Sequence, residues 1–221
     1  MSRAKKAKEF FKGCNQEFCR EGAVLARDNA RTHFNAAEML KSGDYLGLAL
    51  SHYILSIEES IKSHVLITSA IGAGVDPERL CEAFSDHRAK HLSAASFTLS
   101  SALLVPIAKK LAERNPEISD SPVNPSSDAL AIWGRGIDLE EMIVGLDLDW
   151  WQQANINKEV GFYVDVDYAR QSWKSPKSVS DADVEKAHKI AEAVLSRVEL
   201  LFSVPFGDLR NAFKDAESKS N

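Results

Sequence analysis

The sequence predicts an all-α fold: a helical bundle with antiparallel long helices and one irregular insertion. Apolar residues recur every three or four positions over most of the 221 residues, which is the spacing of one helix face. Residue types that begin and end helices stand at the ends of these stretches. Alternation typical of a strand is confined to residues 162–167, where a short extended piece is expected. The chain is predicted to form a single domain over residues 1–221.

The first two helices are predicted over about residues 16–41 and 45–71. Between them, Gly43 suits a left-handed C-terminal position and Asp44 suits an N-cap. A link this short makes neighbouring helices antiparallel. The second helix has an apolar stripe and, about 150° away, a second apolar patch, which indicates a helix enclosed between neighbours or between subunits. The stripe consists of Leu46, Leu50, Ile54, Ile57, Ile61 and Val65, and the patch of Leu48, Leu55 and Leu66.

A third helix is predicted to begin at Asp76–Pro77 and to continue to about residue 114. Residues 115–127 hold three prolines and four serines, which predicts a surface loop. The aromatic segment that follows is expected to be helical over about residues 138–160.

The last long helix is predicted to begin after Ser180, with Asp183 completing a capping box. Its apolar periodicity continues to Phe202, and Pro205 ends it. The tail from about residue 205 is weakly amphipathic and is expected to be flexible and to fray.

Composition excludes several classes of protein. The net charge of −5 argues against a protein that coats nucleic acid by bulk charge, although a local basic pocket remains compatible with it. No apolar run approaches the roughly 20 residues of a membrane helix. The N-terminus is basic but lacks the apolar core of a secretory signal. Three cysteines, an odd number, predict reduced thiols and a cytoplasmic location.

Charged residues bracket the second apolar patch of the second helix. Glu59 and Lys62 are three positions apart, and Glu58 and Lys62 are four apart, so either pair can form an ion pair on one helix face. One interpretation is a solvated ion pair of little consequence. The other is that these groups are partners for polar residues on the antiparallel third helix.

The third helix places His87 and His91 in the middle of its apolar stripe, flanked by Lys90. Buried imidazoles need partners, which Glu59 and Lys62 could provide. Metal ligands, satisfied structural histidines and a proton-transfer site are all interpretations of this pair. The HExxH pattern is absent and Arg88 and Lys90 would repel a cation, so no metal is predicted. A basic residue beside a histidine suits a phosphate substrate.

Four short motifs follow one another in a fixed order: Glu58-Glu59-x-x-Lys62, Phe84-x-x-His87-x-x-Lys90, Gly161-Phe162-Tyr163-Val164-Asp165 and Trp173-x-x-Pro176. Their order and spacing resemble the AbiV family of abortive-infection proteins over about residues 20–202. The chain departs from the family pattern at Ile61, where members tend to have glycine.

The AbiV family is similar to the HEPN superfamily of α-helical bundles, many of which are metal-independent ribonucleases that dimerise to build one site from two chains. The resemblance therefore implies a HEPN-like bundle, a homodimer, RNA as substrate, no cofactor, and phage defence triggered by a phage-encoded activator. The usual HEPN signature, Arg-x(4–6)-His, has one match at Arg27 and His33, which a chain of this composition produces by chance.

RNA cleavage without metal needs a base for the 2′-hydroxyl, a cation on the phosphorane and an acid for the leaving 5′-oxygen. We expect His87 to act as base or acid and Lys90 as the cation. Glu59 would orient His87 or pair with Lys62, and Lys62 would add positive charge. Auxiliary candidates are Glu58, Arg88, His91, Tyr163 and Asp165, with Tyr163 either at the rim of the site or a core tyrosine.

The rival hypothesis is a non-enzymatic binding module. In it, the Glu/Lys/His cluster is a polar network that fixes helix register or a dimer or partner interface. Accessibility separates the two, because a catalytic cluster must be open to a phosphate and a register-fixing network is closed.

Overall fold

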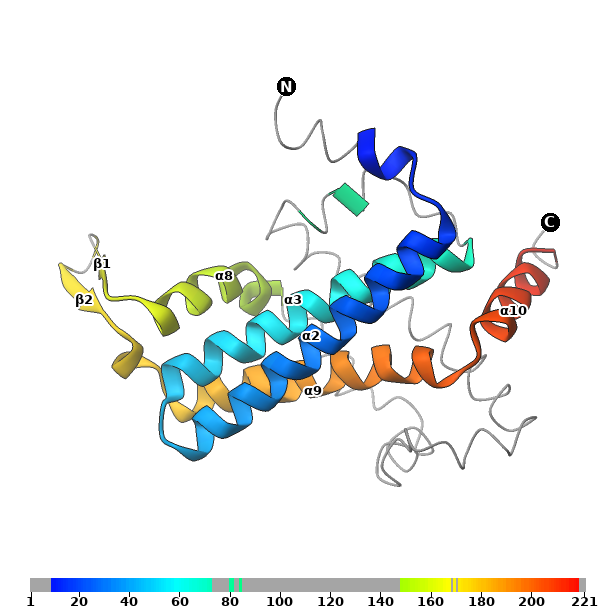
Figure 1. The fold of residues 1–221 in the computed structure, drawn as a ribbon. Helices are drawn as coiled ribbons and strands as arrows, with labels where there is room; N and C mark the ends of the chain where they lie inside the picture. The colour runs from blue at the N-terminus through cyan, green and yellow to red at the C-terminus, as the bar shows by residue number, and fades with distance from the viewer. Residues whose placement is uncertain are drawn as a thin grey trace.

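The computed structural model describes residues 9–72, 80–81, 84, 148–167, 169 and 171–218. Helices dominate these residues, as predicted: α2, α3 and α9 lie side by side, α8 covers a further side of α3, and a small hairpin lies at one end (Figure 1). The elements are α2 (Gln16–Ser42), α3 (Leu46–Ile71), α8 (Leu148–Phe162), β1 (Asp165–Asp167), β2 (Ser172–Lys174), the 3₁₀ turn η2 (Pro176–Ser178), α9 (Asp181–Ser203) and α10 (Phe206–Ser218). The all-α bundle is confirmed.

Helix α3 is the central helix. Its predicted stripe forms the main core, with Leu50, Ile54, Ile57 and Ile61 no more than 2 % exposed. Ile61, the departure from the family pattern, is therefore a core residue. In the second patch, Leu66 is buried against Gly22 of α2, and Leu48 and Leu55 are half-buried. The prediction of an enclosed helix is correct, because α2, α8 and α9 all contact α3.

The link between α2 and α3 differs from its prediction. Gly43 has φ −89°, so it is not left-handed, and Asp44 takes the left-handed conformation with φ 63°. The N-cap of α3 is Tyr45, without a side-chain cap. Aspartate tolerates the left-handed region better than most residues. Backbone bonds close the turn instead, including Tyr45 N to Leu40 O at 2.9 Å.

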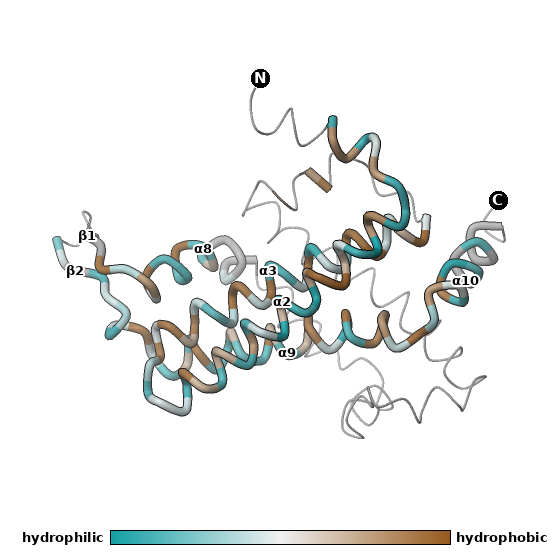
Figure 2. The backbone as a smooth tube through the Cα atoms, viewed as in Figure 1, coloured by the Kyte–Doolittle hydropathy of each residue, from teal (hydrophilic) through white to brown (hydrophobic). Residues whose placement is uncertain are grey.

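The start of α9 is the predicted capping box. Asp183 N donates to Ser180 Oγ at 3.3 Å, and Ser180 N donates to Asp183 Oδ2 at 3.2 Å. The tail after Pro205 is helical over α10, where frayed chain was expected. Leu209 is 5 % exposed and packs in a second core cluster with Leu201 and Val204, so tertiary contacts stabilise this helix, which is also more strongly amphipathic than expected. Figure 2 shows hydrophobic and hydrophilic residues alternating along α2 and α9, as expected of helices with one buried face.

Parts of the prediction fall outside the described residues. They include most of the third helix, the loop at 115–127 and residues 138–147. The extended piece expected at 162–167 is β1, paired antiparallel with β2, although Phe162 itself ends α8. Cys14, Cys19 and Cys81 are free thiols. Within the described part of the chain, no helix has the length and apolar content that crossing a bilayer requires.

Candidate functional site

The first glutamate of the Glu58-Glu59-x-x-Lys62 motif lies in a closed ion pair. Glu58 is 2 % exposed, and its Oε1 accepts a hydrogen bond from Lys158 Nζ of α8 at 2.7 Å. Beside it, Ser51 Oγ donates to the Lys158 carbonyl oxygen at 2.8 Å. Glu58 therefore pairs with Lys158 and not with Lys62, and the pair joins α3 to α8.

Two further motifs pack against the same end of α3. A Cβ added at Gly161 would lie 2.1 Å from Ser51 Oγ and 2.2 Å from the Gly47 carbonyl oxygen, so α8 approaches α3 as closely as only glycine permits. A Cβ added at Gly47 would lie 2.6 Å from Cβ of Pro176. The glycine of the Gly-Phe-Tyr-Val-Asp motif and the proline of the Trp-x-x-Pro motif are thus packing residues.

The second glutamate faces a different environment. Glu59 forms an ion pair with Lys62, and their side chains are 15 % and 17 % exposed. Lys62 Nζ also lies 5.8 Å from the ring centroid of Phe84, the first residue of the Phe-x-x-His-x-x-Lys motif. Glu59 thus pairs with Lys62, one of the two roles expected for it, and the other, orienting His87, lies outside the described residues.

A pair of histidines joins α2 to α3, and no motif in the sequence points to it. His33 Nδ1 of α2 lies 3.1 Å from His52 Nδ1 of α3, and both rings are half-buried. Phe162 of α8 contacts the other side of His52, edge to face, at 5.9 Å between ring centroids. Nineteen positions separate the two histidines, so only closure of the α2–α3 hairpin joins them.

The electrostatics keep both imidazoles neutral at pH 7. Burial lowers the pKa of His33 and His52 lowers it further, while Glu59 raises it, Lys62 lowers it and Glu58 raises it. Burial alone lowers the pKa of His52. His33 is therefore the ring that responds to the charges of the Glu59–Lys62 pair.

The other candidate residues are distributed as follows. Tyr163 is 66 % exposed, so the core-tyrosine interpretation is wrong, and it contacts only the ring of Phe162 among the described rings. Asp165 lies in β1, opposite Lys174. The remaining predicted site residues lie outside the described part of the chain: His87, Arg88, Lys90 and His91.

The chance Arg-x(4–6)-His match does not form a site. Arg27 lies over the ring of Phe202, 4.5 Å from its centroid, and bonds Asp28. His33, by contrast, contacts His52. The described residues also include no group of three or more His, Cys, Asp or Glu side chains that could hold a metal ion.

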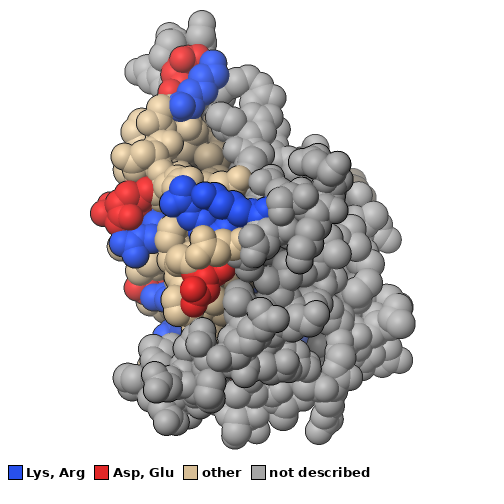
Figure 3. Space-filling model, turned by 90° about the vertical axis from the view of Figure 1, so that its right-hand side faces the viewer, with Lys and Arg blue, Asp and Glu red and all other residues tan. Residues whose placement is uncertain are grey.

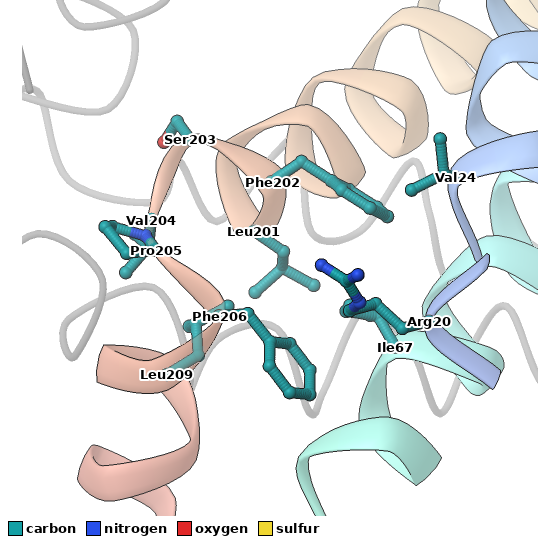
Figure 4. Close-up of a pocket in the computed structure, with 10 residues that line it drawn as sticks. All are labelled: Arg20, Val24, Ile67, Leu201, Phe202, Ser203, Val204, Pro205, Phe206 and Leu209. Atoms are coloured by element: carbon teal, nitrogen blue, oxygen red, sulfur yellow. The ribbon is translucent and has the colours of Figure 1, made fainter. Parts of the chain in front are cut away.

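Two other features of the described residues are separate from this cluster. Glu38 of α2 accepts a hydrogen bond from Tyr53 and lies 3.2 Å from His188 Nε2, which joins α2, α3 and α9. A pocket of about 420 Å³ opens where α10 meets the bundle, lined mainly by apolar side chains with Arg20 at one side (Figure 4). Neither the Glu38 cluster nor this pocket combines an acid, a base and a cation.

Comparison of the chain with models of protein families agrees with the resemblance that the four motifs indicate. The family model of AbiV, a HEPN family, matches residues 18–196. The chain belongs to the AbiV family. Comparisons with curated proteins and with solved structures give no match. Membership assigns this AbiV protein a role of the abortive-infection, HEPN type.

Proposed function

We propose that this AbiV family member is a phage-defence effector that cleaves RNA without a metal ion and arrests growth or translation when a phage product triggers it. One observation carries the proposal. The Glu59–Lys62 pair is partly exposed, and Lys62 faces Phe84, the first residue of the motif that also contains His87 and Lys90. A cation thereby lies near the first residue of the motif to which the proposed acid–base residues belong.

In the proposed reaction, O2′ attacks phosphorus while the 5′-oxygen leaves. His87 acts as base or acid, and Lys90 and Lys62 stabilise the negative charge that develops on the phosphoryl oxygens. Glu59 holds Lys62 in place through their ion pair. Arg88 and His91 are auxiliary groups, and the exposed Tyr163 and Asp165 of β1 lie at the rim.

The proposed active form is a cytoplasmic homodimer of one domain. Helix α2 supports a dimer face, because Phe18, Leu25 and Met39 recur at multiples of seven residues and are 44 %, 71 % and 76 % exposed. Residues seven apart lie on nearly the same side of a helix. A second copy of the chain would cover this apolar row.

The test is cleavage of total bacterial RNA by the purified protein with EDTA present, alone and in extracts of phage-infected cells. Wild type is compared with His87→Ala and Lys62→Ala, and with Lys41→Ala as the matched control on an exposed ion pair. We expect wild type and the control to cleave, and the other two variants to lose at least about 100-fold in rate while staying folded and of dimer mass. Full activity of His87→Ala would overturn this mechanism.

A second candidate is the non-enzymatic binding module, and the Glu58–Lys158 pair favours it. That pair is closed to solvent and fixes the register of α8 on α3, as a structural network does. In this case wild type cleaves no RNA in either setting, and arrest persists in His87→Ala. A pull-down from phage-infected cells would then identify the sequestered partner.

A further inference from the structure

Phenylalanine rings form a partly exposed cluster that ends at Lys62 of α3. Phe10 lies edge to face with Phe11 and with Phe18, at 5.5 and 5.3 Å between ring centroids. Phe11 contacts Phe84 at 5.3 Å, and Lys62 Nζ lies 5.8 Å from the ring centroid of Phe84. A continuous series of contacts therefore leads from Phe18 to the ammonium group of Lys62.

The rings of this cluster differ in how much of them the protein covers. Phe11 is half-buried and packs against the second core cluster, which includes Ile67 and Ile71 at the end of α3. Phe10 and Phe84 both contact Phe11 and are 54 % and 41 % exposed. Single exposed apolar residues are normal, but a contiguous group of them marks a binding surface. Phe11 thus holds two exposed rings, the Phe10–Phe84 surface, at the end of the bundle.

Phe18 borders this surface from α2. It is 44 % exposed and begins the row with Leu25 and Met39 that a second copy of the chain would cover. Because Phe18 contacts Phe10 edge to face, the Phe10–Phe84 surface lies at one end of that row. The surface is continuous with the proposed dimer face without belonging to its seven-residue repeat.

The sequence next to Phe10 is basic, although the whole chain has a net charge of −5. Among the first twelve residues, one is acidic, Glu9, and it pairs with Lys12. The other basic residues there are Arg3, Lys5, Lys6 and Lys8. They precede Phe10 by two to seven positions, so at most about 25 Å of chain separates them from it. Positive charge beside exposed aromatic rings favours a nucleic acid strand over an apolar protein partner.

Lys62 supplies a cation at the other end of the surface. An ammonium group has three N–H donors, and the bond to Glu59 uses one of them. The Lys62 side chain is 17 % exposed, so a phosphate oxygen can reach a further donor beside the ring of Phe84. Stacking of a base on a ring and binding of its phosphate by a cation are the two contacts by which proteins hold single-stranded nucleic acid.

We propose that the Phe10–Phe84 surface binds single-stranded RNA, with about two unpaired bases stacked on the phenylalanine rings and a phosphate bound by Lys62. This inference names the form of the substrate and rests on the proposed ribonuclease function. Bases in a duplex are paired and stacked on one another, so the rings can hold unpaired bases alone. The family model begins at residue 18, so Phe10 lies outside the residues that it matches.

The experiment measures binding of the full chain to a labelled single-stranded RNA oligonucleotide by fluorescence anisotropy, with EDTA present. Methylation of every 2′-oxygen prevents cleavage, because the attacking hydroxyl is then absent. Phe10→Leu and Phe84→Leu keep an apolar side chain but remove the flat ring, and Phe10→Tyr and Phe84→Tyr keep the ring. Tyr45→Leu is the matched control, because Tyr45 is an aromatic residue, 62 % exposed, at the opposite end of α3.

We expect each leucine variant to raise the dissociation constant about 5- to 150-fold, and each tyrosine variant to stay within about threefold of wild type. Tyr45→Leu should bind as wild type does. Lys62→Met should weaken binding and make the slope of log K against log salt shallower by about 0.7, the value for one phosphate contact. Circular dichroism and light scattering check the fold and the mass of every variant.

An oligonucleotide of the same length with abasic sites separates base contacts from phosphate contacts. It should bind wild type more weakly, and Phe10→Leu should change its dissociation constant by less than about twofold, because no base is left to stack. If Phe10→Leu weakens the abasic and the complete strand by the same factor, stacking on this ring is wrong. This comparison holds for any variant, whatever its stability.

Three other results would overturn the inference: leucine variants that bind as wild type, a duplex that binds as tightly as the single strand, and wild type that binds no single strand at up to about 100 µM. Leucine variants that lose dimer mass but keep RNA binding would show a protein interface instead. In each case, cleavage by wild type in the EDTA assay would leave the ribonuclease function standing. Ring-dependent binding without any cleavage would support the surface and contradict the ribonuclease.

Discussion

At the level of single residues, the two adjacent glutamates of one motif have different surroundings. Consecutive side chains on a helix point about 100° apart, so Glu58 faces Lys158 of α8 while Glu59 pairs with Lys62 on α3. The buried Glu58–Lys158 pair fixes how α8 sits on α3. The Glu59–Lys62 pair keeps partial access to solvent, and it is the half of the motif that the proposed reaction uses.

Lys158→Met is expected to destabilise the protein strongly. It removes the lysine that donates to the buried carboxylate of Glu58, and breaking a buried ion pair costs about 3–5 kcal/mol. Urea unfolding followed by circular dichroism measures the change. Lys41→Met, which breaks the exposed pair with Glu185, is the control and should leave the midpoint unchanged. A Lys158→Met midpoint equal to that of the control would show that the pair carries no net stability.

His64 predicts the pH dependence of stability. Burial lowers the pKa of His64 to about 3, while its ordinary value in the unfolded chain is about 6.5. The unfolded chain therefore binds the proton first, and the free energy of unfolding falls as the pH drops from about 6.5 towards 3. Between about pH 6.5 and 5 the loss from this residue is about 2 kcal/mol.

Urea midpoints at pH 7 and pH 5 test this, with His64→Gln expected to reduce the difference. His33 and His52 shift in the same direction, so part of the dependence should remain in the variant. Equal midpoints of wild type at the two pH values would contradict the assignment.

At the level of elements, the structure depends on how closely α8 crosses α3. The crossing point is Gly161 against Ser51 and the backbone of Gly47, and η2 packs on the other side of Gly47 through Pro176. Motif residues far apart in the sequence therefore meet around one turn of α3. This explains the packing role of the glycine of one motif and the proline of the other.

Gly161→Ala is expected to force α8 away from α3 and to cost about 1–3 kcal/mol. Thermal unfolding measures it. Gly207→Ala is the control, because a Cβ there meets nothing within 4 Å, and alanine should be neutral or stabilising in α10. Adding Ser51→Ala should not rescue Gly161→Ala, since the Gly47 carbonyl oxygen still blocks the methyl group. Equal melting temperatures for the two alanine variants would contradict the close crossing.

Most helix boundaries among the described residues follow from local chemistry. The Ser180–Asp183 capping box and the end of α9 before Pro205 are where the sequence predicts them. The α2–α3 turn differs from its prediction, because Asp44 takes the left-handed conformation that was expected of Gly43. Both residue types tolerate that turn, so only the geometry of the closed hairpin selects between them. The sequence predicted a frayed tail in place of α10, because the stability of this helix comes from the packing of Leu209 in the core.

At the level of the whole molecule, the chain is mildly acidic, and charged side chains among the described residues pair between helices. The net charge is −5, and on the face in Figure 3 the described acidic and basic side chains lie next to one another. Ion pairs of Arg31 with Glu199 and of Lys41 with Glu185 tie α2 to α9 at 2.6 and 2.9 Å. Binding of RNA by such a surface would rely on a few local contacts.

We therefore expect RNA binding to depend only weakly on salt. With about one to three phosphate contacts, the slope of log K against log salt for single-stranded RNA should be about −1 to −2. Fluorescence anisotropy of a labelled oligonucleotide measures it, with His87→Ala used to prevent cleavage. A slope of about −5 or steeper would indicate a broad basic face and contradict the local site.

Local sequence patterns predict the helical class, helices α2, α3 and α9, the capping box of α9 and the family, because each depends on neighbours within a few positions or on short motifs. It also singled out Glu59 and Lys62, which lie one turn apart on α3. The partners of the motif residues become visible in the folded chain alone. Glu58 bonds a lysine 100 positions away, and His33 meets His52 across a hairpin. Such contacts are set by helix crossing and rotation, which no local pattern specifies.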